Sequence, residues 1–505
     1  MEPQFPFTVP GGSPREAISE GEARFERLRA TGGLFLGPAA FLLILAFPFA
    51  LEAQAHRLAA ILAWVVIYWV TEAIPLPATA LLGPLLCVIL GVAEMKAVFA
   101  SFAHPIIFLF IGSFMIAQAM MVHGLDRRLA TTLLSRPWVS RTPFRLMMVL
   151  GGFTALLSMW ISNTAATVMV YPIVLGLLRG IPACGAGYTT GMLLMVAYGA
   201  SIGGLGTLIG TPPNMLGVGL IREQIGVKIS FAEWMLFGVP LMAAMLAVLV
   251  GLLYWLHRPT GRWNSAGGST TAAPSRTPWS PGERNAAIVF GVAVVLWLFP
   301  AVLALTVGPD SPAALAYERR MPETAVAMLA ALLLFLLPVN WAARTFTLTW
   351  RDAASINWGT ILLFGGGLAL GDLMFKTQLS QVIGSGLADF LRVESLWAVT
   401  GFAILLGIVM SELTSNTASA TMVIPVVIAV AKAAGVDPLP PALGACLGAS
   451  YGFMLPISTA PNAIIYGSGL VPIRRMVRAG ILFDLAGFVI IWLGLWLLYP
   501  LLQGL

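Results

Sequence analysis

The chain has 505 residues, of which 58% are hydrophobic and only 10% are charged, and its mean hydropathy is +0.89. A soluble globular protein carries about 25% charged residues, so this composition excludes a soluble domain and predicts an all-α polytopic membrane protein. The net charge of +6 does not indicate nucleic-acid binding, because the basic residues lie in short segments between apolar runs. No metal-ligand spacing, phosphate-binding loop or catalytic motif occurs, so the sequence predicts no enzyme.

Apolar runs long enough to cross or enter a bilayer divide the chain into two halves. A polar arm, residues 1–31, precedes them, and its helical pattern predicts a cytosolic or interfacial helix. A Gly-, Ser-, Thr- and Pro-rich segment, residues 257–284, reads as a flexible cytosolic linker between the halves. The runs lie near residues 34–51, 58–71, 78–93, 104–122, 143–180, 188–222 and 232–256 in the first half, and 286–307, 323–339, 358–375, 396–433 and 480–503 in the second.

One polar triplet occurs once in each half, inside an apolar run. The first copy is Ser162-Asn163-Thr164 and the second is Ser415-Asn416-Thr417, and each has a further serine, Ser158 or Ser411, four residues upstream. Polar groups at that depth are costly unless they face protein, water or a ligand. We therefore expect two re-entrant hairpins with the triplets at their tips.

A second feature is also duplicated, a membrane helix broken near its middle. Residues 199–217 contain six glycines and Pro212-Pro213, which cannot form one regular helix, so we place a break near Gly210–Asn214. The corresponding break in the second half lies near Ser458–Asn462. The hairpin triplets are 253 residues apart, as are Gly112 and Gly365, and the breaks are 248 residues apart. This nearly constant offset predicts an internal duplication.

The topology follows from the hairpins. If each hairpin returns to its own side, each half has five crossings, and the additional first helix makes about eleven in all. The halves are then inverted repeats. Most of the 28 Lys and Arg residues fall on the side of the N-terminal arm and the linker. We expect the protein to lie in the cell inner (plasma) membrane. By the positive-inside rule, its N-terminus is expected in the cytoplasm and its C-terminus on the outside.

The tips and breaks offer the chemistry of an anion and cation site. Helix N-termini and neutral hydroxyl and amide donors suit a carboxylate, and freed carbonyl and hydroxyl oxygens suit Na⁺. No Lys or Arg lies within the tips, so an anion would need co-bound cations to offset its desolvation.

These motifs, together with the Glu72–Pro77 segment EAIPLP, resemble the divalent anion:sodium symporter family of di- and tricarboxylate transporters. The resemblance covers about residues 34–503. It implies a homodimer and an elevator mechanism, in which a transport domain moves against a scaffold. It divides the first repeat with its leading helix, residues 32–256, into scaffold helices 34–93 and a transport part at about 104–222. The second repeat, 285–505, divides into scaffold helices at about 286–339 and a transport part at about 358–470.

The resemblance also implies specific site residues, without any catalytic residue. The first Na⁺ site would use Ser158, Ser162, Asn163 and Gly210, and the second would use Ser411, Thr414, Asn416 and Ser458. The substrate would meet Asn163, Thr164, Thr211, Ser415, Asn416 and Thr417. The family usually has two prolines in the second break, where this chain has Ala460 before Pro461, which affects the backbone next to the substrate. The intramembrane acid Glu412 is either a functional group or a partner of a nearby backbone N–H.

The expected function is secondary active transport of small dicarboxylates, C4 acids such as succinate, malate and fumarate, with symport of two or more Na⁺ ions. Sulfate or a tricarboxylate as the substrate, or Na⁺-independent exchange, are the alternatives. A channel is less favoured, because the polar residues cluster at one depth instead of lining a continuous pore.

Overall fold

A computed structural model describes residues 20–134, 136–179, 185–260, 278–308, 310–391 and 395–502. These residues are helical almost throughout, with one small antiparallel pair of strands, β1 (Pro338–Asn340) and β2 (Thr345–Phe346). Within the described ranges, ten helices are long and apolar enough to cross a membrane. The all-α polytopic membrane fold predicted from the composition is therefore confirmed.

The helices of the two halves correspond to each other. The first half contains α1 (Glu20–Ala46), α2 (Ala53–Thr71), α3 (Leu76–Ile89), α4 (Met95–Phe99), η1 (Ala100–Ala103), α5 (Pro105–Val122), α6 (Leu125–Leu134), η2 (Val139–Arg141), α7 (Pro143–Ser158), α8 (Asn163–Arg179), α9 (Gly185–Gly203), η4 (Gly204–Gly206), α10 (Pro212–Ile225) and α11 (Phe231–Leu256). The second half contains α12 (Pro281–Val307), α13 (Pro312–Arg320), α14 (Glu323–Leu336), α15 (Trp350–Ala353), α16 (Trp358–Lys376), α17 (Leu379–Leu391), α18 (Leu396–Leu413), α19 (Asn416–Ala433), α20 (Leu439–Gly448), α21 (Ala460–Tyr466) and α22 (Ile473–Leu502).

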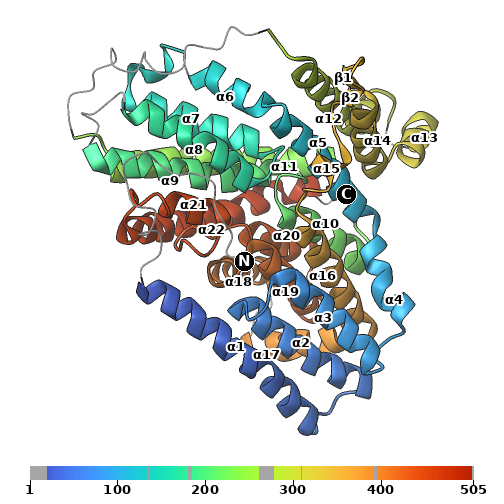
Figure 1. Cartoon of the computed structure of the whole chain (residues 1–505). Helices are drawn as coiled ribbons and strands as arrows, with labels where there is room; N and C mark the ends of the chain where they lie inside the picture. Colours follow the sequence, from blue (N-terminus) through green and yellow to red (C-terminus); the bar gives the residue numbers. More distant parts are fainter. Residues whose placement is uncertain are drawn as a thin grey trace.

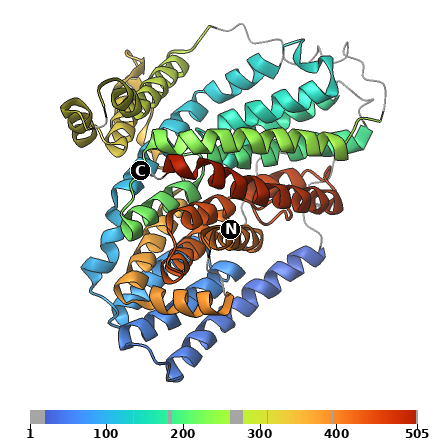
Figure 2. The same cartoon turned by 180° about the vertical axis from the view of Figure 1, so that it is seen from behind.

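The duplication predicted from the sequence appears in the helix boundaries. Helices α18 and α19 begin 253 residues after α7 and α8, and α21 begins 248 residues after α10. Each pair of hairpin arms also packs on the first part of the broken helix of its own half, α7 on α9 and α18 on α20. The two last long helices of the repeats, α11 and α22, run side by side, as Figure 2 shows.

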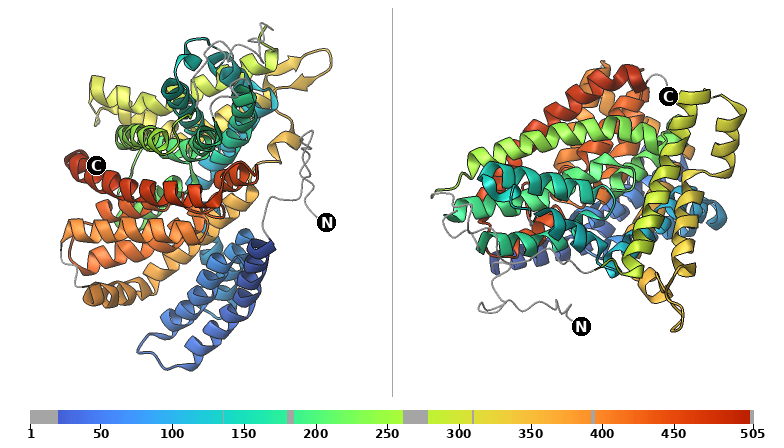
Figure 3. Two further views of the ribbon diagram at one scale, coloured as in Figure 1. Left: turned by 90° about the vertical axis from the view of Figure 1, so that its left-hand side faces the viewer. Right: turned by 90° about the horizontal axis from the view of Figure 1, so that it is seen from above.

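The hairpins and broken helices occupy the middle of the molecule. Figure 1 shows α1–α3 at one end, beside α16 and α17, with which they share a hydrophobic core. Helices α12–α14 lie at the opposite end, and α14 packs closely on α5. The β1–β2 hairpin projects from that end (Figure 3). This arrangement places both hairpin tips and both breaks between two peripheral groups of helices.

The glycine triplet in α16 is a packing face. A Cβ on Gly366 would lie 2.2 Å from the carbonyl oxygen of Ala80 in α3, and Gly365 and Gly367 face Phe102 and Thr421 in the same close manner. Glycine is required at Gly366 because the backbones of α16 and α3 approach too closely for a side chain.

Helices extend into both polar segments. Helix α1 begins at Glu20, so the helix expected in the polar arm of residues 1–31 continues without a break into the first apolar segment. Helix α12 begins at Pro281, inside the linker placed at 257–284, because Ser280 and Glu283 form a capping box there. The rest of the arm, 1–19, and linker residues 261–277 lie outside the described residues.

Candidate functional site

Each Ser-Asn-Thr triplet lies where two antiparallel helices meet. The first hairpin is α7 and α8, joined by residues 159–162, and the second is α18 and α19, joined by Thr414 and Ser415. The triplet serines cap the second arms, since Ser162 Oγ accepts from Ala165 N at 3.2 Å and Ser415 Oγ accepts from Ala418 N at 3.3 Å. The sequence prediction of two hairpins with triplets at their tips agrees with this geometry.

The upstream serines hold the tip asparagines in place. Ser158 Oγ donates to Asn163 Oδ1 at 2.8 Å, and Ser411 Oγ donates to Asn416 Oδ1 at 2.8 Å. Both serines are fully buried. The repeated pair leaves lone pairs on the serine and amide oxygens, which are ligand types that Na⁺ accepts.

The breaks are held open by a pair of asparagines that the sequence reasoning did not assign. Asn214 Nδ2 donates to the carbonyls of Gly204 (2.8 Å) and Thr207 (2.7 Å). In the second half, Asn462 Nδ2 donates in the same way to Gly452 and Leu455, both at 3.0 Å. Each amide satisfies carbonyls that lack a helical partner inside the protein. The signal in the sequence was the Asn that closes both break motifs.

The first break meets the first tip at Gly204. A Cβ on Gly204 would lie 2.7 Å from Asn163 Oδ1 and 3.1 Å from the carbonyl oxygen of Gly210. These two oxygens therefore lie around one glycine, next to the Ser158 hydroxyl that bonds Asn163. Three of the four residues expected at the first Na⁺ site come together here.

The second break meets the second tip in the same way at Gly452. A Cβ on Gly452 would lie 3.0 Å from Ser411 Oγ and 3.0 Å from Ser458 Cβ. Thr414, also expected at the second Na⁺ site, has its hydroxyl directed elsewhere, because Oγ1 donates to the Trp69 carbonyl of α2 at 2.7 Å. Only the remaining lone pairs or the backbone of Thr414 are left for a cation.

One cavity of about 810 Å³ joins both tips and both breaks. All six residues expected to bind substrate line it, together with three of the remaining expected Na⁺ ligands. These residues are Asn163, Thr164, Thr211, Ser415, Asn416 and Thr417, and Ser162, Gly210 and Ser458. Ser158, Ser411 and Thr414 lie behind this lining.

Several helices begin at the cavity. The first residues of α8, α10 and α19, namely Asn163, Pro212 and Asn416, line it, as does Ala460 at the start of the short α21. Such termini carry partial positive charge. Ala460 retains the N–H that Pro212 lacks in the first break, so the departure from the family pattern adds one backbone donor.

Asp126 of α6 is the charged residue among the described residues that line the cavity. Its Oδ1 accepts from the backbone N–H of Arg127 at 2.8 Å. Burial raises the pKa of Asp126, and the backbone hydrogen bond and the charge of Arg127 act in the opposite direction. A carboxylate here disfavours an anionic substrate at the α6 end of the cavity.

The two tips differ in exposure. Ser162 and Thr164 of the first tip are exposed, whereas Ser415 is half-buried and Thr417 retains only 9% of its accessible surface. The cavity also reaches Met121 and Asp126, where α5 ends and α6 begins. The first tip is therefore more exposed than the second.

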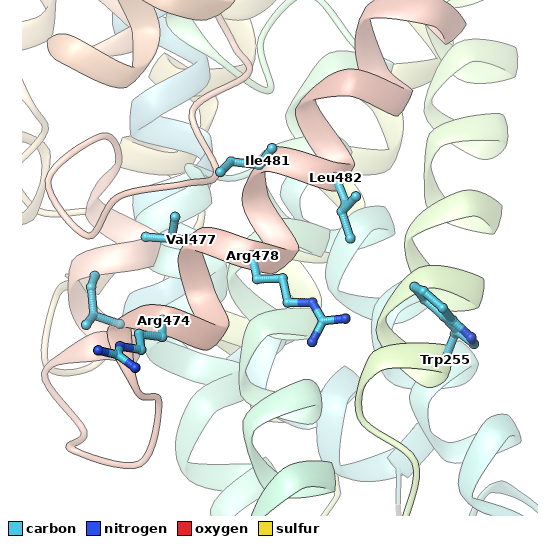
Figure 4. A pocket seen from close by; sticks show the side chains of 7 residues that line it. Trp255, Arg474, Val477, Arg478, Ile481 and Leu482 are labelled. Atoms are coloured by element: carbon cyan, nitrogen blue, oxygen red, sulfur yellow. The ribbon is translucent and has the colours of Figure 1, made fainter.

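A separate groove of about 610 Å³ lies between the end of α11 and the start of α22. Figure 4 shows Arg478 extending from α22 on the side of Trp255, with Arg474 one turn away. Its other lining residues are apolar, and it contains none of the tip or break residues. It is not part of the candidate site.

The family described as "Sodium:sulfate symporter transmembrane region" matches residues 33–503. The chain is 33% identical over 490 residues to the sodium-dependent dicarboxylate transporter SdcS of Staphylococcus aureus, covering 94% of this chain and 92% of SdcS. It is 32% identical over 455 residues to an uncharacterized transporter of Haemophilus influenzae, covering 89% and 93% of the two chains. The solved YdaH transporter of Alcanivorax borkumensis matches 80% of this chain and 88% of its own, with a TM-score of 0.56 and 13% identity, and this match supports the fold alone.

Proposed function

Because the chain belongs to the sodium:sulfate symporter family, and is therefore a membrane transporter and not an enzyme, we propose that it carries C4 dicarboxylates such as succinate, malate and fumarate in symport with Na⁺. The membership confirms the resemblance found in the sequence. The proposal is supported chiefly by the convergence of two equivalent tips and their helix N-termini on one cavity.

The two-tip cavity favours a linear dianion. Each tip offers hydroxyl, amide and backbone N–H donors, so a C4 acid can place one carboxylate at each tip. Sulfate is too compact to reach both, and a monocarboxylate would leave one cluster of donors unpaired, at about 1–3 kcal/mol per unsatisfied group. SdcS, a relative named as a sodium-dependent dicarboxylate transporter, agrees with this choice.

Na⁺ coupling is supported by the oxygen clusters behind the tips. The first consists of Ser158, Asn163 and Gly210, and the second of Ser411, Asn416 and Ser458, with Ser162 and Thr414 as the further ligands that the family resemblance implies. Bound cations there would offset the charge of a dianion in a cavity whose described lining has no Lys or Arg.

An elevator movement is supported by the unequal tips. With the basic segments inside, α6 lies on the cytoplasmic side. Because α6 packs on α8, the second arm of the more exposed first tip, we propose that this is an inward-facing state. Inverted repeats allow the tips to exchange roles in the outward-facing state. The scaffold is assigned to 34–93 and about 286–339, and the transport part to about 104–222 and 358–470. We further propose a homodimer, as the family resemblance implies.

Counterflow in proteoliposomes tests the function. Vesicles loaded with succinate should accumulate labelled succinate when Na⁺ is present, and malate and fumarate should compete. Competition by sulfate, citrate and lactate tests the alternative substrates. The same assay without Na⁺ tests the alternative of Na⁺-independent exchange. Equal competition by sulfate and malate would contradict the two-tip binding mode, and full activity without Na⁺ would indicate exchange.

Asn163→Ala and Asn416→Ala test the Na⁺ assignment within that function. Each removes an oxygen from the proposed ion cluster and leaves a buried serine hydroxyl without its acceptor. We expect a higher Na⁺ concentration for half-maximal uptake together with weaker substrate affinity. Wild-type Na⁺ activation in both variants would remove the assignment.

A further inference from the structure

A buried carboxylate lies directly behind the second tip. Glu412, near the end of α18, retains 3% of its accessible surface. Its Oε1 accepts from Met454 N at 2.8 Å and its Oε2 accepts from Ser458 Oγ at 2.6 Å. Both oxygens of Glu412 therefore have a hydrogen-bond donor. Glu412 therefore has a backbone N–H partner, that of Met454, which is one of the two roles expected for it.

A second buried acid contacts the first. The side chain of Asp484, on α22, lies against that of Glu412 and retains 6% of its accessible surface. Among the described residues, neither of its oxygens has a hydrogen-bond donor. The contact therefore joins two groups of acceptors and lacks the positive charge or donor that would make it favourable.

An unpartnered hydroxyl faces the same region. Tyr451 is fully buried, and its hydroxyl has no hydrogen-bond partner in the part of the chain that the structure describes. Its ring packs on α22 at Gly487, one turn beyond Asp484 on the same helix face, and Asp484 acts on it electrostatically. Tyr198, the other tyrosine beside the acids, already donates to the Phe453 carbonyl at 2.6 Å.

The acids have no counter-charge in the described part of the chain. Glu412 is the only charged group there that acts on Asp484. The first repeat dispenses with this arrangement, because Met159 occupies the position equivalent to Glu412 and Gly203 the position equivalent to Tyr451. The hairpin and break therefore form without the acids, and their burial in a membrane segment calls for a ligand.

We propose that Glu412, Asp484 and the Tyr451 hydroxyl form a further Na⁺ site, next to the second tip and distinct from the two tip clusters. A proton on Asp484 would form one hydrogen bond, to Glu412, and would leave the second Asp484 oxygen and the Tyr451 oxygen without a partner. A Na⁺ ion, in contrast, can be coordinated by several of these oxygens at once. The choice of Na⁺ rests on the proposed function. The hydrogen bond from Ser458 to Glu412 connects this site to the second tip cluster, to which Ser458 belongs.

Equilibrium binding of ²²Na⁺ to purified, substrate-free protein tests the proposal without requiring transport. Asp484→Asn keeps the shape and supplies Glu412 with a neutral donor, and it should bind one Na⁺ fewer per protomer than the wild type. Asp389→Asn, at an exposed position on α17, makes the same charge change and should keep the wild-type number. Proteoliposomes that fail to transport any dicarboxylate would contradict the proposed function and leave this binding result standing.

A second variant covers the case in which Asp484→Asn does not fold. Tyr451→Phe removes only the hydroxyl, and it should keep the number of bound Na⁺ ions while weakening one of them severalfold. An unchanged binding isotherm in Tyr451→Phe, or an unchanged number of ions in folded Asp484→Asn, overturns the site. Loss of proton binding with unchanged Na⁺ binding in Asp484→Asn would overturn Na⁺ as its occupant.

Discussion

Gly204 gives the sharpest test of the first ion cluster, because a single added methyl group would enter it. In Gly204→Ala, the new Cβ would lie 2.7 Å from Asn163 Oδ1, 3.0 Å from Thr211 Cβ and 3.1 Å from the Gly210 oxygen. Overpacking of this kind costs about 1–3 kcal/mol, which corresponds to a decrease in apparent Na⁺ affinity of about 5- to 140-fold if the displaced atoms are the ligands.

The assay is Na⁺ activation of labelled succinate uptake in proteoliposomes, with thermal melting to verify folding. Gly152→Ala is the matched control, because Gly152 lies in α7 of the same hairpin and its Cβ would meet no atom within 4 Å. Gly452→Ala should reproduce the effect at the second cluster. A folded Gly204→Ala protein with the Na⁺ activation of the wild type would refute the placement of the first ion.

Three further predictions address the break, the tips and the cavity mouth. Asn462→Ala leaves the buried Gly452 carbonyl without its donor and the Leu455 carbonyl with the Ser458 N–H alone, so the melting temperature should fall by an amount reflecting about 1–3 kcal/mol for the unsatisfied carbonyl, and an unchanged melting curve would contradict this role. Thr164→Val and Thr417→Val each remove one hydroxyl at nearly constant volume and should raise the succinate concentration for half-maximal uptake, while Na⁺ activation stays intact. Asp126→Asn removes a negative charge from the cavity and should tighten succinate binding near neutral pH. Since the pKa of Asp126 is raised, that advantage over the wild type should shrink as the pH falls and the wild-type carboxyl becomes neutral.

The parts of the site that depend on local spacing were predictable from the sequence. Ser158 and Asn163 are five residues apart across a helix end, so their contact follows from the hairpin alone, and its repetition at Ser411 and Asn416 made the prediction specific. The polar arm also had a helical pattern, but its continuation into the first membrane helix without a break was not predictable, because hydropathy marks the bilayer and not the helix.

Contacts between segments that are far apart in the chain could not be predicted from the sequence. Glu412 and Asp484 are 72 residues apart, and their contact depends on the rotation of α22 about its axis, which a helix that is apolar nearly all round does not reveal. Gly204 is one of several glycines in the first break, and the pattern does not indicate which of them faces Asn163. The packing of the tip against the break decides that.

The last prediction concerns Thr414, whose hydroxyl joins the second tip to α2. The bond from Thr414 Oγ1 to the Trp69 carbonyl connects the proposed transport part to the proposed scaffold, and Ile161, the equivalent residue in the first tip, cannot form it. Movement of the transport part should break this bond, so it stabilises the state in which the second tip is covered. Thr414→Val, which imitates Ile161, removes about 1 kcal/mol of stabilisation from the state in which the second tip is covered. It should therefore shift the equilibrium about fivefold toward the state in which that tip is uncovered.

The assay labels a cysteine placed at Ser415 on a cysteine-free background with an impermeant thiol reagent, applied from the side opposite α6. In the Thr414→Val protein this cysteine should react up to about fivefold faster than in the parent. If the substitution changes Na⁺ activation and leaves the labelling rate unchanged, Thr414 acts as an ion ligand and the bond to Trp69 does not control access.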